Sequence, residues 1–412
     1  MPTVEEGPTR RFLEKREAIL DAAARLFNRR GINGTTLSDV AQSVGLVTNS
    51  VTYYYRKKDD LAQACMLRSV DVFDGLLADA EKAKTPELRI TAFVTGFCRL
   101  LADVEMEARP QFINFSEVNA LSAARADIVA AYARMFRRVR GLIGADSGLG
   151  LQRSECNARA HLLFTLIQWI RVWINRYEVS GYARAGRHVG DILLHGIGRD
   201  GAGWAPPMLP IFAGRPPVDE ISPDAFLRVA TRLINEEGAR GVSVERISAA
   251  LKVTKGAFYH HNDNKDDLIV ACFERTFDVI RRAQAAADEC AFGWQRLSAA
   301  AAALVRYQLS HDGPLLRITA RSGLPEAEAE QTIRTMNRLS EHFASVVVDG
   351  VADGSVRPID PTIAAQMMTS MINASASIKR WVPDATIGNV ADLYARPLFM
   401  GILCPSVSRM KG

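Results

Sequence analysis

The sequence of 412 residues has few cysteines and no arrangement of them that would bind a metal or build a disulfide framework. The six cysteines are scattered without a Cys-x-x-Cys pair, and none of the seven histidines has the spacing of a metal ligand. We therefore expect no metal and no other cofactor. Dispersed, unpaired cysteines are typical of a reducing compartment, so we expect a cytoplasmic location.

Long hydrophobic runs and catalytic groupings are missing as well. No stretch of about 18 uncharged apolar residues occurs, so we expect no association with a membrane. The first residues include Glu5 and Glu6 without an apolar stretch, unlike a secretory signal. No Ser-His-Asp, Cys-His or paired-carboxylate arrangement stands out, which argues against an enzyme.

A strong excess of one charge is also absent. The sequence has 51 Lys and Arg against 46 Asp and Glu, a formal net charge of +5. This balance permits nucleic-acid binding without demanding it. The composition is otherwise globular, because 48% hydrophobic residues are enough to bury large cores.

What the sequence does contain is an internal repeat. A shift of 207 residues aligns residues 18–74 with 225–281 without a gap and gives 17 identities in 57 positions. About four would be expected by chance for average composition. Near the end of each half, Ile170–Trp173 resembles Ile378–Trp381 at an offset of 208. The chain is therefore a tandem duplication of a unit of about 200 residues.

The expected fold class is all-α. Apolar residues recur at helical spacing, and no segment has sustained alternation of period two. Thr36 to Asp39 has the spacing of a capping box that opens a short helix, and Gly45 allows a turn before a third short helix ending near Tyr55. Further helices are expected at 87–104, 110–123, 126–142, 154–178 and 183–195.

Three short helices, the last two joined by a tight turn, are the architecture of a helix-turn-helix DNA reader. We divide the chain into five parts on this basis. They are a first reader at 10–60, a first helical body at 61–199, a Gly/Pro-rich linker at 200–220, a second reader at 221–267 and a second body at 268–408. Trp204, Ile211 and Phe212 suggest that the linker is partly packed.

Both readers follow one residue pattern. It runs from an apolar first helix through Gly and Thr to a segment like Gly-Val-Ser-x-Gly-x-Leu-Tyr-x-His-Phe, and then to Lys-x-x-Leu. The first reader follows it at Ile19, Ala22, Ala23, Leu26, Phe27, Gly31, Thr36, Val40, Ala41, Gly45, Tyr54, Tyr55, Lys58 and Leu61. The second follows it at Ala230, Leu233, Gly238, Ser243, Ile247, Thr254, Lys255, Gly256, Tyr259, His261, Lys265 and Leu268.

In this pattern each half resembles the TetR family of bacterial transcriptional regulators. The resemblance implies a DNA reader followed by a helical domain that binds an effector and dimerises. The residues expected to contact DNA are Thr36, Thr48, Asn49, Thr52, Tyr53, Tyr54 and Lys58 in the first unit, and Ser243, Thr254, Lys255, Gly256, Tyr259, His261 and Lys265 in the second. Tyr55 is expected to be core.

The two readers depart from the pattern differently. The first has Val47, Asn49 and Thr52 where Ser or Thr, Gly and Tyr are usual, whereas the second has Ser248, Lys252 and Asn262 where Ala, Gly and Phe are usual. Residues 10–60 hold ten basic and six acidic residues, a net charge of +4, but residues 221–268 hold seven of each. We expect the first reader to carry more of the salt-dependent affinity.

The bodies carry the expected effector site. Phe93, Phe97, Phe112 and Phe115 lie on segments that would surround a pocket for a small hydrophobic or amphipathic molecule. Trp169, Trp173 and Tyr177 form a stripe at helical spacing, with Met367, Met368, Met371 and Trp381 in the corresponding region of the second unit. We expect this stripe to serve packing between helices.

The expected function is a repressor of transcription that binds an operator in double-stranded DNA and is released by its effector. The two units would form a pseudodimer within one chain, with two unlike readers. One alternative is a homodimer of whole chains with one functional reader each. Another is a ligand-binding or interaction module that has lost DNA binding.

Overall fold

The computed structural model describes residues 9–115, 126–144, 149–210, 223–239, 241–251 and 264–406. These residues are mostly helical, and the pairing of extended backbone among them is confined to an isolated bridge between Gly198 and Val356. The expected all-α class is confirmed.

Among its described residues, the first unit has a reader of three α-helices and a body of five α-helices. The reader helices are α1 (Arg10–Arg30), α2 (Leu37–Ser43) and α3 (Thr48–Tyr54). The body helices are α4 (Lys58–Glu81), α5 (Pro86–Glu105), α6 (Ala126–Ile143), α7 (Arg153–Trp173) and α8 (Tyr182–His195).

The second unit repeats this order with a different ending. Its reader contains α9 (Pro223–Glu237) and α10 (Val244–Leu251). Its body contains α12 (Lys265–Asp288), α13 (Gly293–Leu309), the 3-10 helix η5 (Ile318–Gly323), α14 (Glu326–Ala352), α15 (Pro361–Ser375), the π-helix η7 (Ala391–Ala395) and α16 (Arg396–Phe399). The single helix α8 of the first unit is thus matched by two short segments, η7 and α16.

Local sequence explains where the reader helices begin. Thr9 caps α1 by accepting from the backbone N–H of Phe12. Thr36 and Asp39 form the expected capping box at the start of α2, because each side chain accepts from the other residue's backbone N–H. Gly45 has a φ of +66°, the left-handed conformation that the turn between α2 and α3 requires.

The helix expected at 110–123 is wrong over its described part. Residues 111–114 form an extended loop, and 116–123 lie outside the described residues. The loop replaces helical hydrogen bonds with bonds to side chains of the neighbouring helices. The N–H groups of Gln111, Ile113 and Asn114 donate to Asp21, Ser69 and Asn28, respectively.

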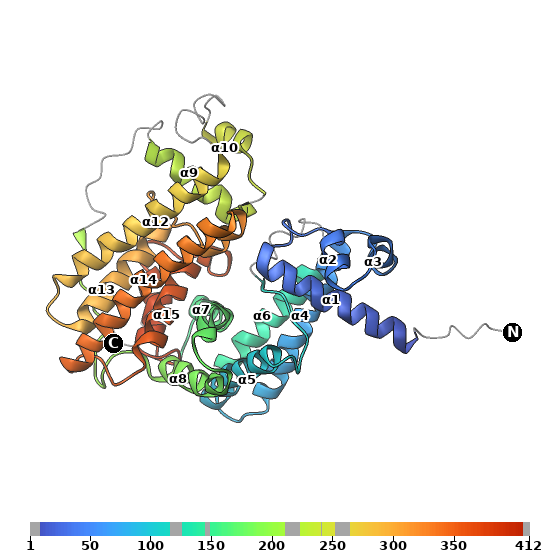
Figure 1. Cartoon of the computed structure of the whole chain (residues 1–412). Coiled ribbons are helices and arrows are strands. Elements are labelled where there is room, and N and C mark those ends of the chain that lie inside the picture. The colour runs from blue at the N-terminus through green and yellow to red at the C-terminus, as the bar shows by residue number, and fades with distance from the viewer. Residues whose placement is uncertain are drawn as a thin grey trace.

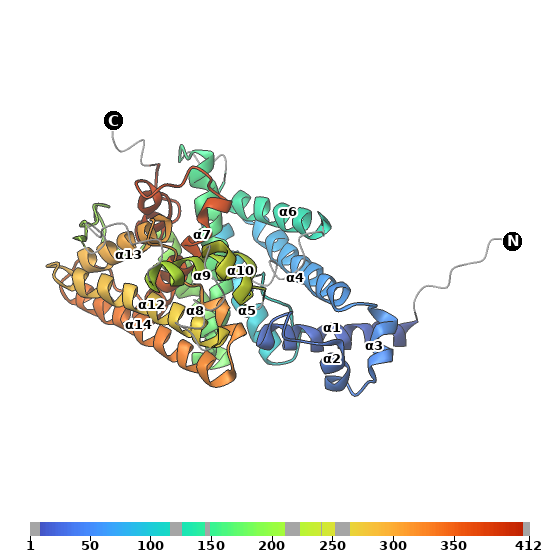
Figure 2. The same cartoon turned by 90° about the horizontal axis from the view of Figure 1, so that it is seen from above.

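The two units pack through the last helices of their bodies. Helix α7 lies beside α15 and η7, and α8 lies against α15 and α16. Figure 1 shows α7 next to α15, and both Figures 1 and 2 show the first reader projecting to one side. Trp169 on α7 donates its indole N–H to Gln366 on α15 at 3.1 Å. We call this contact between the units the seam.

The aromatic stripe of α7 serves this packing, as expected. Trp169 and Trp173 are buried, as are Met367, Met368 and Met371 of α15. Trp381, which follows α15, stacks on Phe136 of α6 with ring centroids 3.9 Å apart. The linker is also packed where it is described, because Trp204 donates to Asp392 at 2.8 Å and contacts Phe399.

Reciprocal main-chain bonds close the seam. The N–H of Ile197 donates to the carbonyl of Phe399 at 2.9 Å, and the N–H of Ile402 donates to the carbonyl of Leu193 at 2.7 Å. Gly196 and Gly401 have φ values of +74° and +90°, and a Cβ on either would overlap a carbonyl oxygen of the other unit. This exchange of equivalent bonds is the signature of a two-fold contact.

The close approach at Gly196 predicts a specific loss of stability. Gly196→Ala should lower the free energy of unfolding by at least about 2 kcal/mol more than Gly201→Ala. Gly201 is the matched control because its φ is +77° but no heavy atom lies within 4 Å of the point that a Cβ would occupy there. Urea unfolding followed by circular dichroism measures both, and equal losses would contradict the tight seam.

Candidate nucleic-acid interface and effector cavity

The first reader exposes one face of α3. Thr48 and Asn49 are exposed, Thr52 is half-buried, and Val51 is fully buried and anchors the helix on the core. The exposed side chains can donate to and accept from phosphates and base edges. Tyr55 is buried, as expected, and it fixes the end of α3 on the core.

Aromatic side chains extend this face at the end of α3. Tyr53 is 76% exposed, whereas Tyr54 is half-buried. Their rings contact each other, with centroids 5.3 Å apart, and the ring of Tyr54 lies 4.8 Å from that of Phe12 on α1. Phe12 therefore holds the tyrosine pair in place. Contact of the two tyrosines with DNA stays a prediction.

Lys58 and Thr36 each lie at the start of a helix of the first unit. Lys58 is the first residue of α4, so its cation sits at the boundary between reader and body. The hydroxyl of Thr36 donates to the carboxylate of Asp39 at 2.6 Å, and the backbone N–H of Thr36 donates to the same carboxylate. These two hydrogen bonds lower the pKa of Asp39. Thr36 therefore fixes the start of α2, and its contact with DNA stays a prediction.

The second reader is described only in part. Ser243 accepts from the N–H of Arg246 at 3.3 Å and so caps α10, and Lys265 begins α12 as Lys58 begins α4. The remaining expected contact residues, Thr254, Lys255, Gly256, Tyr259 and His261, lie outside the described residues, as does Asn262.

Each reader is tied to its body by the same set of hydrogen bonds. In the first unit, Asn28 of α1 donates to the carbonyl of Phe112 at 2.9 Å and accepts from the N–H of Asn114. Arg68 of α4 pairs with Glu17 of α1 at 3.3 Å and also donates to the carbonyl of Gln111. We call this set of bonds the junction, because it joins a reader helix, a body helix and the loop after α5 or α13.

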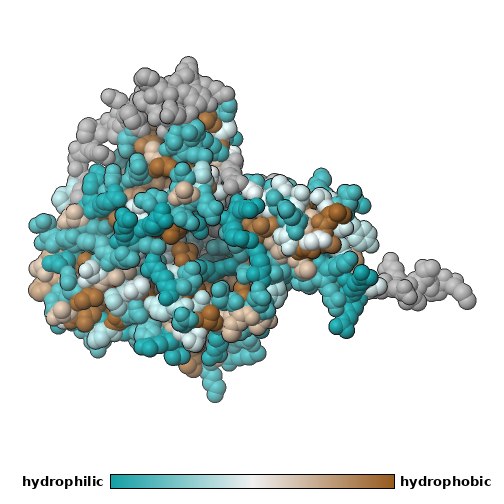
Figure 3. Space-filling view, in the orientation of Figure 1, coloured by the Kyte–Doolittle hydropathy of each residue, from teal (hydrophilic) through white to brown (hydrophobic). Residues whose placement is uncertain are grey.

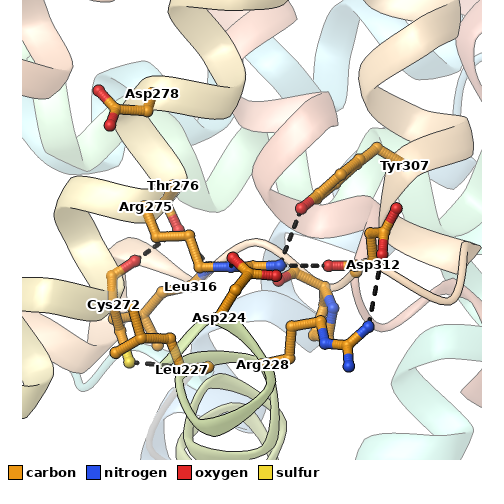
Figure 4. Close-up of polar contacts among 12 residues, drawn as sticks. Asp224, Leu227, Arg228, Cys272, Arg275, Thr276, Asp278, Tyr307, Asp312 and Leu316 are labelled. Carbon is orange, nitrogen blue, oxygen red and sulfur yellow. Dashed lines mark hydrogen bonds and ion pairs between the residues drawn. The ribbon is translucent and has the colours of Figure 1, made fainter. Parts of the chain in front are cut away.

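The second unit repeats the junction with equivalent residues. Asn235 donates to the carbonyl of Leu315 at 2.9 Å and accepts from the N–H of Arg317. Figure 4 shows Arg275 reaching from α12 between Asp224 and Tyr307, with hydrogen bonds of 2.9 Å to each. Thr276 accepts from the N–H of Leu316, as Ser69 accepts from Ile113.

The junction explains several identities of the repeat. The pairs Asn28/Asn235, Cys65/Cys272 and Arg68/Arg275 all belong to it, and both thiols donate to a carbonyl of the reader helix at 3.6 Å. Burial raises the pKa of the Cys65 thiol to about 12, so it stays protonated as a donor. Identity between the units therefore marks the connection between reader and body as well as the reader itself.

The phenylalanines expected to line an effector pocket lie together in the first body. Phe93, Phe97 and Phe112 are fully buried and contact Phe73 with centroids 5.4–6.3 Å apart. Phe115 also contacts Phe73 and, in addition, lines a cavity. Their binding of an effector stays a prediction, and Phe115 is the one that a ligand in this cavity would touch.

That cavity lies between the two units and has a volume of about 880 Å³, within the range of small-molecule sites. Its walls come from the ends of α1 and α9, from α7 and α15, and from η5. Hydrophilic residues predominate where the two halves meet in the view of Figure 3. The cavity thus touches both readers and both sides of the seam.

Comparison with known proteins identifies the repeated unit. Residues 19–65 and 226–272 each match the family model described as "Bacterial regulatory proteins, tetR family". Residues 292–382 match a model described as "Tetracyclin repressor-like, C-terminal domain". The chain thus carries two TetR-like units in tandem, each with a match to the family's N-terminal model. The matched models describe regulatory proteins rather than enzymes.

Individual relatives match shorter parts of the chain. The Transposon Tn10 TetC protein of Escherichia coli is 36% identical over 73 residues, 18% of this chain and 37% of that protein. The regulator TtgR of Pseudomonas putida is 32% identical over 101 residues, 24% of this chain and 48% of that protein. The chain spans less than half the length of these two relatives. The TetR-family structure PfmR from Thermus thermophilus is 24% identical and covers 43% of this chain and 98% of its own, with a TM-score of 0.37.

Two further observations concern the described residues of the TetR-like units. No helix in these ranges is both long enough and apolar enough to cross a bilayer. Within the same ranges, no group of three or more His, Cys, Asp or Glu side chains is placed to hold a metal ion.

Sequence reasoning missed the cationic side chains of the cavity, above all Arg171, Arg317 and Arg321. One signal was present: Arg171 near the end of α7 aligns with Lys379 of the 3-10 helix η6 (Ile378–Arg380) at the offset of 208, so both units carry a cation at this point. It could not be interpreted without knowing that the two units pack through these ends of their bodies.

The junction predicts an unequal response to removing two ion pairs of α12. Arg275→Met should lower the free energy of unfolding by about 3 kcal/mol, because it leaves the buried partners of Arg275 without a donor. Arg281→Met is the control, because Arg281 pairs with Asp278 at 2.8 Å on the surface, and it should cost less than about 1 kcal/mol. Urea unfolding tests this, and similar losses would argue against the junction.

His161 predicts a dependence of stability on pH. It is buried on α7, and burial, with Arg317 nearby, lowers its pKa from 6.5 to about 3. The unfolded chain therefore binds this proton first, and stability falls as the pH drops from about 6.5 toward 3. His161→Gln should remove this loss. As the pH is lowered from 7 to 4, the free energy of unfolding of wild type should fall by up to a few kcal/mol more than that of the variant.

The control for this titration is His195→Gln, an exposed position at the end of α8. Unfolding at pH 7, 6, 5 and 4 should follow the wild-type pH profile in this variant. A His161→Gln profile parallel to that of wild type would show that His161 does not carry the pH dependence.

Proposed function

We propose that the chain is a ligand-relieved repressor of transcription that acts as a single-chain pseudodimer on double-stranded DNA. The observation that carries the proposal is the seam, which joins two TetR-like units within one polypeptide. A regulator of this type needs two readers at a spacing that matches the DNA helix. The tandem arrangement supplies both readers from one chain and makes their association intramolecular.

The reading surface of the first unit supports DNA binding. Its α3 exposes hydroxyl, amide and phenol groups, and residues 10–60 carry a net charge of +4. Such a surface attracts phosphates and offers groups to base edges. The second reader is electrically neutral and differs in its recognition residues, so we propose that the two half-sites of the operator differ.

The junction supports control by an effector. Each reader helix is hydrogen-bonded to a loop of its body, and the loops lead into the cavity between the units. A small hydrophobic or amphipathic molecule that binds one spacing of the readers better than another would shift the equilibrium between the two. The spacing that fits the operator would then be depleted, and repression would end.

The assembly and the operator are tested together. Light scattering on the purified chain should give a mass near 45.2 kDa, and selection from random DNA should yield two unlike half-sites. A mass near twice that value would favour a homodimer with one functional reader per chain. A perfect inverted repeat would contradict the unlike readers.

Contact by the first reader predicts a change in the salt dependence of binding. Lys58→Ala should weaken binding to the selected duplex and to unrelated duplexes by a similar factor. It should also reduce the magnitude of the slope of log K against log salt by about 1. Tyr53→Ala should weaken binding without changing that slope. Lys82→Ala, at the far end of α4 and paired with Asp79 at 2.7 Å, is the matched control. Unchanged affinity in both reader variants would favour a module that has lost DNA binding.

A further inference from the structure

The cavity between the units has a large excess of positive charge. Seven basic residues line it, against Glu236 as the one acidic residue among its described lining. Arg171, Arg317 and Arg321 lie in its interior walls and are partly or largely shielded from solvent, whereas the remaining cations are exposed near its edge.

The interior arginines have no carboxylate partners among the described residues. Arg171 donates to the carbonyl of Phe112 at 3.1 Å, and its guanidinium lies 4.4 Å above the Phe112 ring. Arg317 donates to the carbonyl of Asn235, and its Nε has no hydrogen-bond partner. Within the described part of the chain, no ion pair is formed by Arg171, Arg317 or Arg321.

This arrangement is costly without a counter-charge. Burial lowers the pKa of Arg171 to about 10 and also lowers the pKa of Arg321, while burial and then Arg380 lower the pKa of Arg317. A shielded cation without an anion loses hydration that one carbonyl acceptor replaces only in part. Planar guanidinium groups suit phosphate and carboxylate oxygens, which they bind through paired N–H donors.

Apolar side chains share the same cavity. Phe115, Trp169 and Trp381 lie in its walls, together with Ile318 at the start of η5. The cavity therefore offers an anion site and an aromatic surface side by side, and its volume of about 880 Å³ holds a molecule with both parts.

We propose that this cavity binds an amphipathic small molecule bearing a phosphate-type or carboxylate-type anion, held by Arg171, Arg317 and Arg321. The proposal deepens the proposed function, on which it rests, because it gives the effector its chemical class and its place. The site lies between the units, with one ligand touching both, rather than within the phenylalanine cluster of the first body.

The position of η5 shows how such a ligand would act on both readers. This segment carries Arg321 and follows Arg317, and it contacts α1 of the first unit. Its last residue, Gly323, lies against Ala239, just after the second reader's first helix. An anion that draws η5 and Arg171 together changes the contacts of η5 with α1 and with Ala239 at once.

Ligand binding is tested on the full chain without DNA. The probe is 1-anilinonaphthalene-8-sulfonate, an aromatic anion, and the matched neutral probe is N-phenyl-1-naphthylamine, which lacks the sulfonate. The anionic probe should bind more tightly, weaken with salt and be displaced by inorganic pyrophosphate. Arg321→Gln and Arg171→Gln should each weaken the anionic probe about tenfold and leave the neutral probe unchanged.

Two variants control the experiment. Arg321→Lys keeps the charge and should lose less affinity than Arg321→Gln, and Arg334→Gln, an exposed arginine of α14 outside the cavity, should bind as wild type does. Circular dichroism and thermal melting check that each variant is folded. Equal weakening of both probes, or of neither, would overturn the proposal.

Duplex binding by the same variants separates the remaining outcomes. If Arg321→Gln leaves probe binding intact but weakens the duplex, the arginines serve the DNA backbone and the proposal is wrong. If anionic probe binding follows the prediction while Lys58→Ala leaves duplex affinity unchanged, the anion site stands and the proposed DNA-binding function falls.

Discussion

The packing of α7 and α8 on α15 and α16 is the constraint on which the other features of this molecule depend. It places the two bodies back to back, so that the ends of α1 and α9 and the segment η5 border one cavity. The reciprocal bonds of Ile197 and Ile402 fix the relation of the two units through main-chain groups rather than through side chains. Side chains across the seam are therefore free to differ, as Trp169 and Gln366 do.

The junction transmits the geometry of the bodies to the readers. An asparagine, an arginine and a hydroxyl bind the same three places of the loop in both units. These side chains satisfy the backbone groups of the loop in place of helical hydrogen bonds. The conformation of the loop therefore depends on its bonds to the reader helix and to the body helix. A displacement of the loop is therefore a displacement of the reader helix.

The sequence allowed the duplication, the all-α class and the reader helices to be predicted, because each depends on spacing within a short segment. Thr36 and Asp39 cap their helix through local bonds alone, whereas the burial of Tyr55 was implied by the resemblance to the TetR pattern. The loop at 111–114 was mistaken for a helix, since its apolar spacing resembles one and its partners Asp21, Asn28 and Ser69 are distant in sequence. The cavity could not be predicted for the same reason: Arg171 and Arg321 line one cavity only when the two units have packed.

The linker and the seam also change how occupancy depends on the amount of protein. When separate subunits must first associate, the concentration of the active dimer is proportional to the square of the subunit concentration at low abundance, and dilution dissociates the dimer. Here the partner of each unit is held at the effective concentration set by the chain itself. On the proposed function, operator occupancy then rises in proportion to the first power of the number of chains, so that a cell with a handful of molecules can still keep a gene silent.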